Sequence, residues 1–442
     1  MAESTGAIWW RPEAKAAEAV PLIPGAGGKS LAFGGLVLFT VVLLLSPQTF
    51  FPVLKTVRIA LVAAGVAIAA HVMDATVRRE PVTPSGPEVS ITVALLGWTV
   101  LTVPFSLWPG GSVSLLTDQY IKALVFFWMI AAMITNRERL RTFAWSLTVC
   151  SIPLAVMALF HFAKGDFLST GTSIKRIEGY AGLSGNPNDL ALTLNLLIPF
   201  TGALLFTTRS LPGRALALFA LLISVPAVIV TFSRAGFLTL AAIVLMGAIC
   251  LMRRGAVLPA IALLVAALSI APALPNGYLE RLSTIVDIDA DPTGSAQGRW
   301  TDYQVATEVV IANPILGVGL GQDILALNAA RGRATWRSVH NAFLEYAVDL
   351  GIPGILLFVS LLVASFATAR RVERFTSRFL PLRDISVFAA AAQIALVGFA
   401  VAAFFHPIAY QFYFFCVAGL AVAVKNVSRT EAQPLRTQVN DR

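Results

Sequence analysis

Long apolar stretches alternate with short polar segments along most of this 442-residue chain. These stretches lack the strict alternation of apolar and polar residues that a membrane β-strand requires, and their lengths suit helices that cross a bilayer. Twelve such spans lie at residues 30–46, 53–73, 89–105, 117–134, 142–162, 189–206, 215–232, 235–252, 256–272, 341–369, 384–405 and 408–424. The pattern therefore predicts an all-α polytopic membrane protein with about twelve transmembrane helices.

The polar segments divide the chain into five parts. These are an N-terminal tail at 1–29, transmembrane helices one to nine at 30–272, a large loop with short helices at 273–339, helices ten to twelve at 340–424, and a C-terminal tail at 425–442. Only 13% of residues are charged and 57% are hydrophobic, whereas a soluble protein has about a quarter charged. The net charge of +9 does not indicate a nucleic-acid partner, because the charges form short clusters between apolar spans.

The distribution of lysine and arginine predicts the orientation in the membrane. With the N-terminus in the cytoplasm, 21 of the 33 basic residues lie on the cytoplasmic side. Residues 215–252 are interrupted mainly by Ser233 and Arg234. We interpret them as two helices in a tight hairpin, because one kinked helix would place the arginines of 370–383 outside. Both termini are then cytoplasmic, and the loops at 163–188 and 273–339 face outward.

Several basic residues lie on the outer side against the general trend. They are Lys175, Arg176, Arg234, Arg299, Arg331, Arg333 and Arg337. A guanidinium group can bind two phosphate oxygens at once and keeps its charge, so these arginines indicate an anionic ligand. Solvated loop charges or contacts with lipid headgroups are the alternative. Arg234 favours the ligand, because a lone arginine between two apolar spans is costly without a partner.

His340 is the strongest candidate for proton transfer. It opens the tenth span directly after three arginines of the large loop. With Ser338 as the N-cap, His340 would occupy the second helical position, where the helix dipole disfavours the imidazolium form. The neighbouring arginines act in the same direction. A neutral imidazole can accept a proton, so the sequence predicts His340 as a general base.

Two further polar motifs have structural interpretations. Asn186 and Pro187 are typical of a helix start, as a cap and a first-turn residue, although a helix N-terminus can also hold an anion. The acidic run of Asp287, Asp289 and Asp291 resembles a calcium loop only in part, because Pro292 stands where an EF-hand needs glycine. We expect no metal site and no cofactor.

Six segments, taken in order, carry a family resemblance. They are Gly182-Leu-Ser-Gly-Asn-Pro-Asn-Asp-Leu-Ala191, Thr231-Phe-Ser-Arg-Ala-Gly236, Gly298-Arg299, Asn313-Pro-Ile-Leu-Gly-Val-Gly319, and His340-Asn-Ala-Phe-Leu-Glu345 with Leu350-Gly-Ile-Pro-Gly354. Together they resemble the O-antigen ligase and polymerase superfamily of bacterial inner membranes. The resemblance covers roughly residues 180–360, and the plan of twelve spans extends it over the chain.

This resemblance implies a metal-independent, inverting glycosyltransferase without a cofactor. Its donor would be a glycan on undecaprenyl diphosphate, and its site would face the periplasm from the bacterial inner membrane. The implied roles are the base for His340 and diphosphate binding for Arg234 and Arg299, with Arg176 as a weaker match. Arg337, Asn341 and Glu345 are further candidates for supporting roles. The product would be a surface polysaccharide such as O-antigen, as part of lipopolysaccharide, or an exopolysaccharide.

Several functional alternatives stay open at this level. A ligase would move whole glycans to lipid A-core or another acceptor, whereas a polymerase would extend the glycan, and both would share the site. A transporter or flippase of lipid-linked sugars should show charges at mid-membrane and broken helices in paired halves, which the spans do not clearly show. A non-catalytic scaffold would not explain the order of the motifs.

Overall fold

The computed structural model describes residues 30–167, 177, 179–270, 272, 274–275, 277–283, 295–332 and 336–440, and these residues form helices joined by turns and loops. The first group of helices is α1 (Leu31–Leu45), α2 (Pro52–Val57), α3 (Ile59–Arg78), α4 (Pro87–Thr102), α5 (Pro109–Leu115), α6 (Ile121–Met133), α7 (Arg137–Lys164), α8 (Pro187–Thr207), α9 (Leu211–Val230), α10 (Arg234–Arg253) and α11 (Val257–Leu268). The second group is α12 (Tyr278–Ser283), α13 (Ser295–Ala312), α14 (Asp323–Arg331), α15 (Ala342–Thr376), α16 (Arg383–Ala403) and α17 (Phe412–Asn440). Short helical turns are η1 (Pro47–Thr49), η2 (Val103–Phe105), η3 (Leu116–Tyr120), η4 (Gly182–Ser184) and η6 (Leu380–Leu382). The all-helical prediction is confirmed for the described residues.

Each of the twelve predicted spans falls on an apolar helix. Ten helical segments of the described chain are long and apolar enough to cross a membrane. The other two spans fall on α1 and α11, which are apolar but shorter. The protein is therefore a multi-pass membrane protein; by length and composition ten crossings are supported, and the predicted count of twelve stays a prediction.

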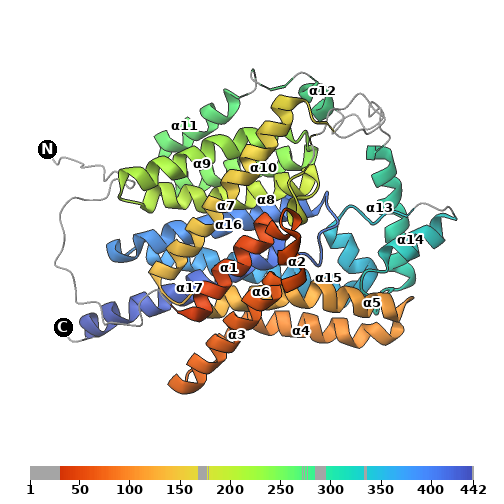
Figure 1. Ribbon diagram of the computed structural model, residues 1–442, viewed down its shortest axis with the longest axis horizontal. Coiled ribbons are helices and arrows are strands. Elements are labelled where there is room, and N and C mark those ends of the chain that lie inside the picture. Colours follow the sequence, from red (N-terminus) through yellow and green to blue (C-terminus); the bar gives the residue numbers. More distant parts are fainter. Residues whose placement is uncertain are drawn as a thin grey trace.

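The centre of the helical bundle is formed by α8, α16 and α17. In the most apolar 18-residue stretch of each of these helices, between 72% and 78% of the residues are buried, compared with 22% in α3. The outer helix α3 exposes large apolar side chains such as Val62, Met73 and Val77, as expected for a surface that faces lipid. Figure 1 shows α13 and α14 together at one end of the bundle and the C-terminus at the opposite end.

The segment 215–252 forms two helices, as the charge distribution predicts. Helix α9 ends at Val230 and α10 begins at Arg234. The intervening turn contains Phe232 with a positive φ of 53°, and Ser233 caps α10 by accepting a hydrogen bond from the Gly236 N–H at 3.1 Å. Arg234 therefore lies at the tip of a helical hairpin.

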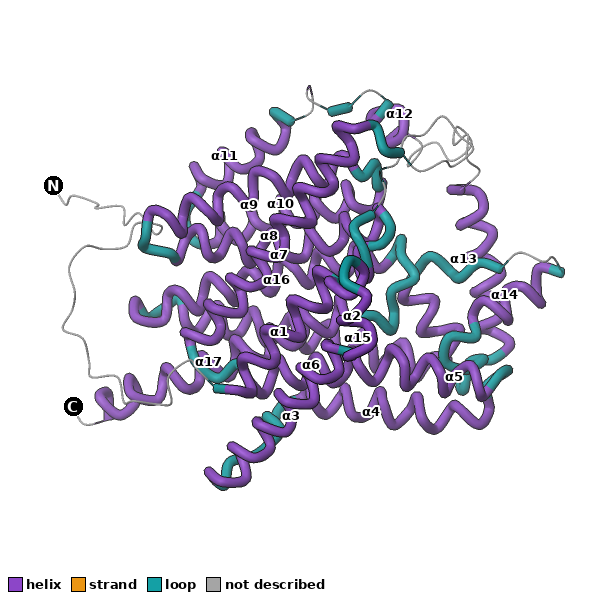
Figure 2. The backbone as a smooth tube through the Cα atoms, in the orientation of Figure 1, coloured by secondary structure: helices purple, strands orange, loops and turns teal. Residues whose placement is uncertain are grey.

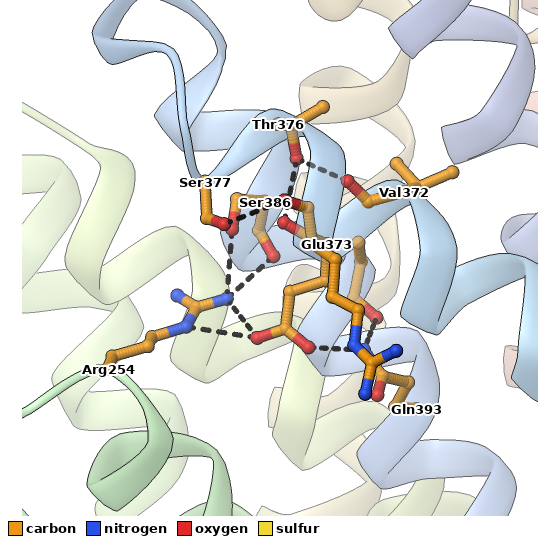
Figure 3. A network of polar contacts seen from close by, with 9 residues as sticks. Arg254, Val372, Glu373, Thr376, Ser377, Ser386 and Gln393 are labelled. Atoms are coloured by element: carbon orange, nitrogen blue, oxygen red, sulfur yellow. Dashed lines mark hydrogen bonds and ion pairs between the residues drawn. The ribbon is translucent and has the colours of Figure 1, made fainter.

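An ion-pair network fixes the helix ends on the side away from α13. Arg254, at the end of α10, donates from Nε and Nη2 to Glu373 Oε1 at 3.0 and 2.7 Å. The same guanidinium reaches the backbone oxygen of Ser386 at 2.9 Å, and Gln393 donates to the second oxygen of Glu373 at 2.7 Å. Figure 3 shows how these side chains converge from α10, α15 and α16. Because both carboxylate oxygens are satisfied, the partly buried pair holds three helices together.

The loop at 313–321 and the segment of α15 around Gly351 pack backbone to backbone. Together they form a platform at the face predicted to point outward. Helix α15 is interrupted at Gly351, where φ is 69° and ψ is −172°. This break lets the Val318 and Gly319 N–H groups donate to Val348 and Asp349 carbonyls, both at 2.9 Å. A Cβ at Gly351 would lie 2.1 Å from the Ile315 carbonyl oxygen. The close approach explains why glycine stands there. Figure 2 shows loop segments gathering toward this end of the bundle.

We expect Gly351→Ala to destabilise the protein. Its backbone conformation is nearly reserved for glycine and would cost alanine about 1–3 kcal/mol, before the clash with Ile315 is added. The measurement is the midpoint of thermal unfolding in detergent, followed by size-exclusion chromatography. Gly65→Ala is the control, because a Cβ there meets no atom within 4 Å. Equal midpoints for the two variants would contradict this assignment.

Candidate functional site

His340 lies just before α15, and the expected cap is corrected. Asn341 is the N-cap, since its side chain accepts hydrogen bonds from the Phe343 and Leu344 N–H groups at 2.9 and 3.2 Å. Ser338 lies too far before the helix, which begins at Ala342, and its hydroxyl instead donates to Asp323 Oδ2 at 2.6 Å. His340 therefore precedes the helix instead of occupying its second position.

The surroundings of His340 still favour the neutral imidazole. Burial, as the largest cause, and then the Arg299 charge lower the pKa of His340 below its usual 6.5. Arg337 acts in the same direction, while Asp302 and the hydrogen bond to Ser338 oppose it. The ring Nδ1 lies 3.0 Å from the Ser338 carbonyl oxygen. Since a carbonyl only accepts, Nδ1 carries the proton and Nε2 is left as the proton acceptor.

Arg299 and Arg337 are the two cations whose charges lower the pKa of His340. Arg299 lies half-buried in the second turn of α13, and Arg337 lies three residues before the histidine with 45% of its side chain exposed. A Cβ at Gly298 would lie 3.0 Å from Arg337 Nη1, so glycine there makes room for the guanidinium. The structure thus brings together three of the predicted residues, one base and two cations.

Asp302 is a charged residue of this site that the sequence did not indicate. Its side chain is 1% exposed, and one carboxylate oxygen lies 2.5 Å from Arg331 Nη2 and 3.5 Å from Arg337 Nη2. The Arg331 side chain is 7% exposed. Arg331 is therefore a structural partner of a buried carboxylate, whereas Arg337 keeps an accessible guanidinium. The structure thus assigns different roles to Arg331 and Arg337, which the sequence alone does not distinguish.

A second carboxylate fixes the segment that carries His340. Asp323, at the start of α14, accepts hydrogen bonds from the Ser338 hydroxyl and from the Val339 N–H, at 2.6 and 3.0 Å. Burial raises the pKa of Asp323, while these two hydrogen bonds and that of the Ile324 N–H lower it. Because the Ser338 carbonyl in turn accepts from His340, Asp323 sets the backbone that orients the imidazole ring.

The buried Asp349 connects α14 to α15. Its carboxylate accepts three backbone hydrogen bonds at 2.7–3.1 Å, from Gly321, Gln322 and Asp323. It also accepts from the hydroxyl of Tyr410 at 2.9 Å. The loop that ends at Gly321 is therefore attached to the same helix that begins beside His340.

Arg234 lies elsewhere, in a cluster at the starts of α8 and α10. The Ser233 hydroxyl donates to Asn188 Oδ1 at 2.8 Å, and Asn195 donates to the Gly236 carbonyl at 2.9 Å. Asn186 caps α8 as expected, accepting from the N–H groups of residues 188 and 189. The two motifs that the sequence holds far apart therefore contact each other, with Arg234 half-buried beside them.

The loop between α16 and α17 joins the two clusters on one face of the protein. The Tyr303 hydroxyl lies 3.0 Å from the His340 carbonyl oxygen and 2.7 Å from that of Phe404. At the other end of this loop, the Tyr413 hydroxyl donates to the Leu183 carbonyl at 2.5 Å, next to the start of α8. The starts of α8, α10 and α15 and the end of α16 thus share one side, as the predicted alternation of spans requires.

The remaining predicted residues divide into structural and undescribed ones. Glu345 is 8% exposed and accepts from the Ala409 N–H at 3.1 Å, so in this structure it anchors the α16–α17 loop. Asn341 is a helix cap. Arg176 and the acidic run at 287–291 lie outside the described residues. Among the residues that are described, no group of three or more metal-ligating side chains is found.

Comparison with known proteins agrees with the resemblance derived from the motifs. Residues 219–359 match the family model described as O-antigen ligase, which confirms the resemblance to the O-antigen ligase and polymerase superfamily. Arg234, Arg299, Arg337 and His340 all lie within the matched segment.

No curated protein matches the chain. A solved chain from a peptidoglycan synthase complex, described as showing structural coordination of polymerization and crosslinking, aligns with 17% identity and a TM-score of 0.44, covering 78% of this chain and 98% of that one.

We expect Arg299→Gln to raise the pKa of His340, because it removes the charge that most disfavours the imidazolium. The measurement is the pH dependence of His340 modification by diethylpyrocarbonate, which reacts with neutral imidazole, read by mass spectrometry. The half-maximal pH should lie below 6.5 in the parent protein and move upward in the variant. Arg378→Gln, at the opposite end of the bundle, is the control and should leave it unchanged. An unchanged or lower value in Arg299→Gln would contradict the coupling.

Proposed function

We propose that this protein is a membrane glycosyltransferase of the O-antigen ligase and polymerase type. It moves a glycan from undecaprenyl diphosphate to an acceptor hydroxyl, on the periplasmic face of the bacterial inner membrane. The observation that carries the proposal is the arrangement at His340. A ring with Nδ1–H bound to a carbonyl and with Nε2 as acceptor lies within the field of the Arg299 charge and within the segment that matches the family.

The proposed reaction is a single displacement with inversion. The acceptor oxygen attacks the anomeric carbon while His340 Nε2 takes the hydroxyl proton. The bond from the anomeric carbon to the diphosphate oxygen breaks, and the lipid diphosphate leaves with the electron pair. A base with a pKa close to or below the working pH is mostly neutral and ready to accept this proton. The lowered pKa of His340 meets that requirement.

Fixed guanidinium groups are suited to the departing diphosphate. Its negative charge grows as the glycosidic bond breaks, so cations held in place stabilise the transition state more than the bound substrate. We assign this role to Arg234, Arg299 and Arg337, and we extend it to Arg176. Positive charge supplied in this way requires no metal ion, so we propose a metal-independent reaction.

Whether the acceptor is a lipid A-core or a growing polysaccharide depends on the surfaces around this site. Both reactions use the same base and the same leaving group. A transporter or flippase is the alternative class. The chemistry of the site favours transfer over transport. Transport of a lipid-linked sugar needs no neutral histidine with an oriented ring, whereas transfer to a hydroxyl does.

The direct test is to give purified protein a polyprenyl-diphosphate glycan together with a lipid A-core acceptor, in the presence of EDTA. Formation of the glycan–core product, or of a lengthened lipid-linked glycan, would identify ligase or polymerase activity. Movement of intact donor between leaflets without either product would instead support the transporter. Activity that EDTA abolishes and Mg²⁺ restores would contradict the metal-independent mechanism.

We expect His340→Ala to lower transfer about 10²–10⁴-fold, the usual contribution of a general base. His340→Gln should do no better, since an amide cannot take the proton. The parent rate should fall as the pH drops through the lowered pKa of His340 and stay level above it. Specific activity is measured per folded molecule after size-exclusion chromatography, with donor binding as the control. Parent-like activity in well-folded His340→Ala would remove this residue from the mechanism.

Arg234→Lys is expected to keep expression and lose most transfer, because lysine keeps the charge and loses the two-pronged contact with phosphate oxygens. Arg214→Lys is the matched control, because Arg214 lies in the first turn of α9, at the end of this helix away from Arg234. The initial rate of product formation at saturating donor distinguishes them. Near-normal turnover by Arg234→Lys would rule out a bidentate contact by this residue.

A further inference from the structure

A polar cavity lies on the side of the protein opposite His340. It has a volume of about 550 Å³ and lies between the C-terminal halves of α15 and α17, close to the start of α4. Its polar lining includes Thr368 and Arg371 from α15, and Lys425, Ser428 and Arg429 from α17. Since α15 begins beside His340 and runs to Thr376, the full length of this helix separates the two sites.

The lining of this cavity carries positive charge and no carboxylate. Glu88, buried behind the wall, lies 2.8 Å from the Lys425 ammonium and also accepts from the Thr368 hydroxyl. This pair is neutral as a whole and fixes the wall. Arg371 and Arg429 then supply a net charge of about +2 on exposed positions, which suits an anion with several oxygens.

Two groups in the wall have no protein partner that would compete with a ligand. Within the described part of the chain, Ser428 and Arg429 make no side-chain hydrogen bond or ion pair. Arg371 Nη2 is directed to the Thr368 hydroxyl at 3.1 Å. The general excess of basic residues on one side of a membrane protein explains their presence. It does not explain why they gather in one cavity with two hydroxyl groups.

The position of the cavity along α17 corresponds to the boundary of the bilayer. Arg429 comes 17 residues after Phe412, the first residue of α17, which corresponds to about 26 Å along a helix. The hydrocarbon core is about 30 Å thick, so a helix that starts at one boundary brings Arg429 close to the other. Apolar side chains, Val372 and Phe375 among them, line the same cavity. A ligand with a charged head and an apolar body would satisfy both parts.

We propose that this cavity binds the phosphate group of an anionic lipid headgroup. Free phosphate shares the oxyanion chemistry, but it would leave the apolar part of the wall uncovered. The site is distinct from the proposed transfer site and does not depend on it.

The test compares lipid binding by two charge-matched double variants. Arg371→Gln/Arg429→Gln removes the two exposed arginines of the cavity. Arg374→Gln/Arg378→Gln removes two exposed cations from the same end of the protein that do not line it. Native mass spectrometry measures retention of phosphatidylglycerol and phosphatidylcholine, and inorganic phosphate is titrated as a competitor. Thermal unfolding in detergent checks that both variants are folded.

Each lost arginine should weaken phosphatidylglycerol binding about tenfold, and the pair about a hundredfold, with phosphatidylcholine little affected. The control variant should bind like the parent protein. Such a result supports the site with a lipid as its source of phosphate. Binding of inorganic phosphate that is lost in the cavity variant, without retention of phosphatidylglycerol, would support an anion site filled from solution. Equal phosphatidylglycerol binding by the two folded variants, with no effect of phosphate, would overturn the proposal.

Discussion

The carboxylate of Asp349 is the point on which the proposed active face depends. It is fully buried and receives three backbone N–H groups from the start of α14 and one hydroxyl from Tyr410. A buried carboxylate with four donors is satisfied, so it holds these segments firmly instead of weakening the core. Through α14 it fixes Asp323, and Asp323 in turn fixes the two residues before His340. The orientation of the imidazole therefore originates within the membrane helix α15.

The charges around this face serve two requirements at once. Arg299 and Arg337 lower the pKa of His340, the proposed base, and we propose that the same cations stabilise the diphosphate leaving group. Left alone, these cations and Arg331 would repel one another. Asp302 counters this by pairing with Arg331 and reaching Arg337 from a buried position. One carboxylate thus lets an exposed guanidinium remain near a histidine whose neutral form the proposed reaction requires.

The sequence predicted the helices well because hydrophobic length is a local property. The hairpin at Arg234 and the Asn186 cap also followed from neighbouring residues. Interactions between distant segments could not be predicted in this way. Asp302 bonds to arginines 29 and 35 residues away. Ser338 looked like a cap, but its hydroxyl donates to the distant Asp323, and Asn341 caps the helix. The missed Asp302 and the wrong cap at Ser338 have the same cause: each side chain bonds to a residue that only the fold brings near.

The break in α15 explains why loop and helix meet without loss of backbone hydrogen bonds. A non-helical residue at this depth is tolerated only if its polar groups find partners inside the protein. The Leu350 carbonyl accepts from the Trp98 indole at 2.8 Å, and the Ile352 N–H donates to the Pro314 carbonyl at 2.8 Å. The kink is thus held from both sides, by α4 and by the loop at 313–321. A platform held in this way fixes the segment that carries His340, and the proposed reaction requires preorganisation of this kind.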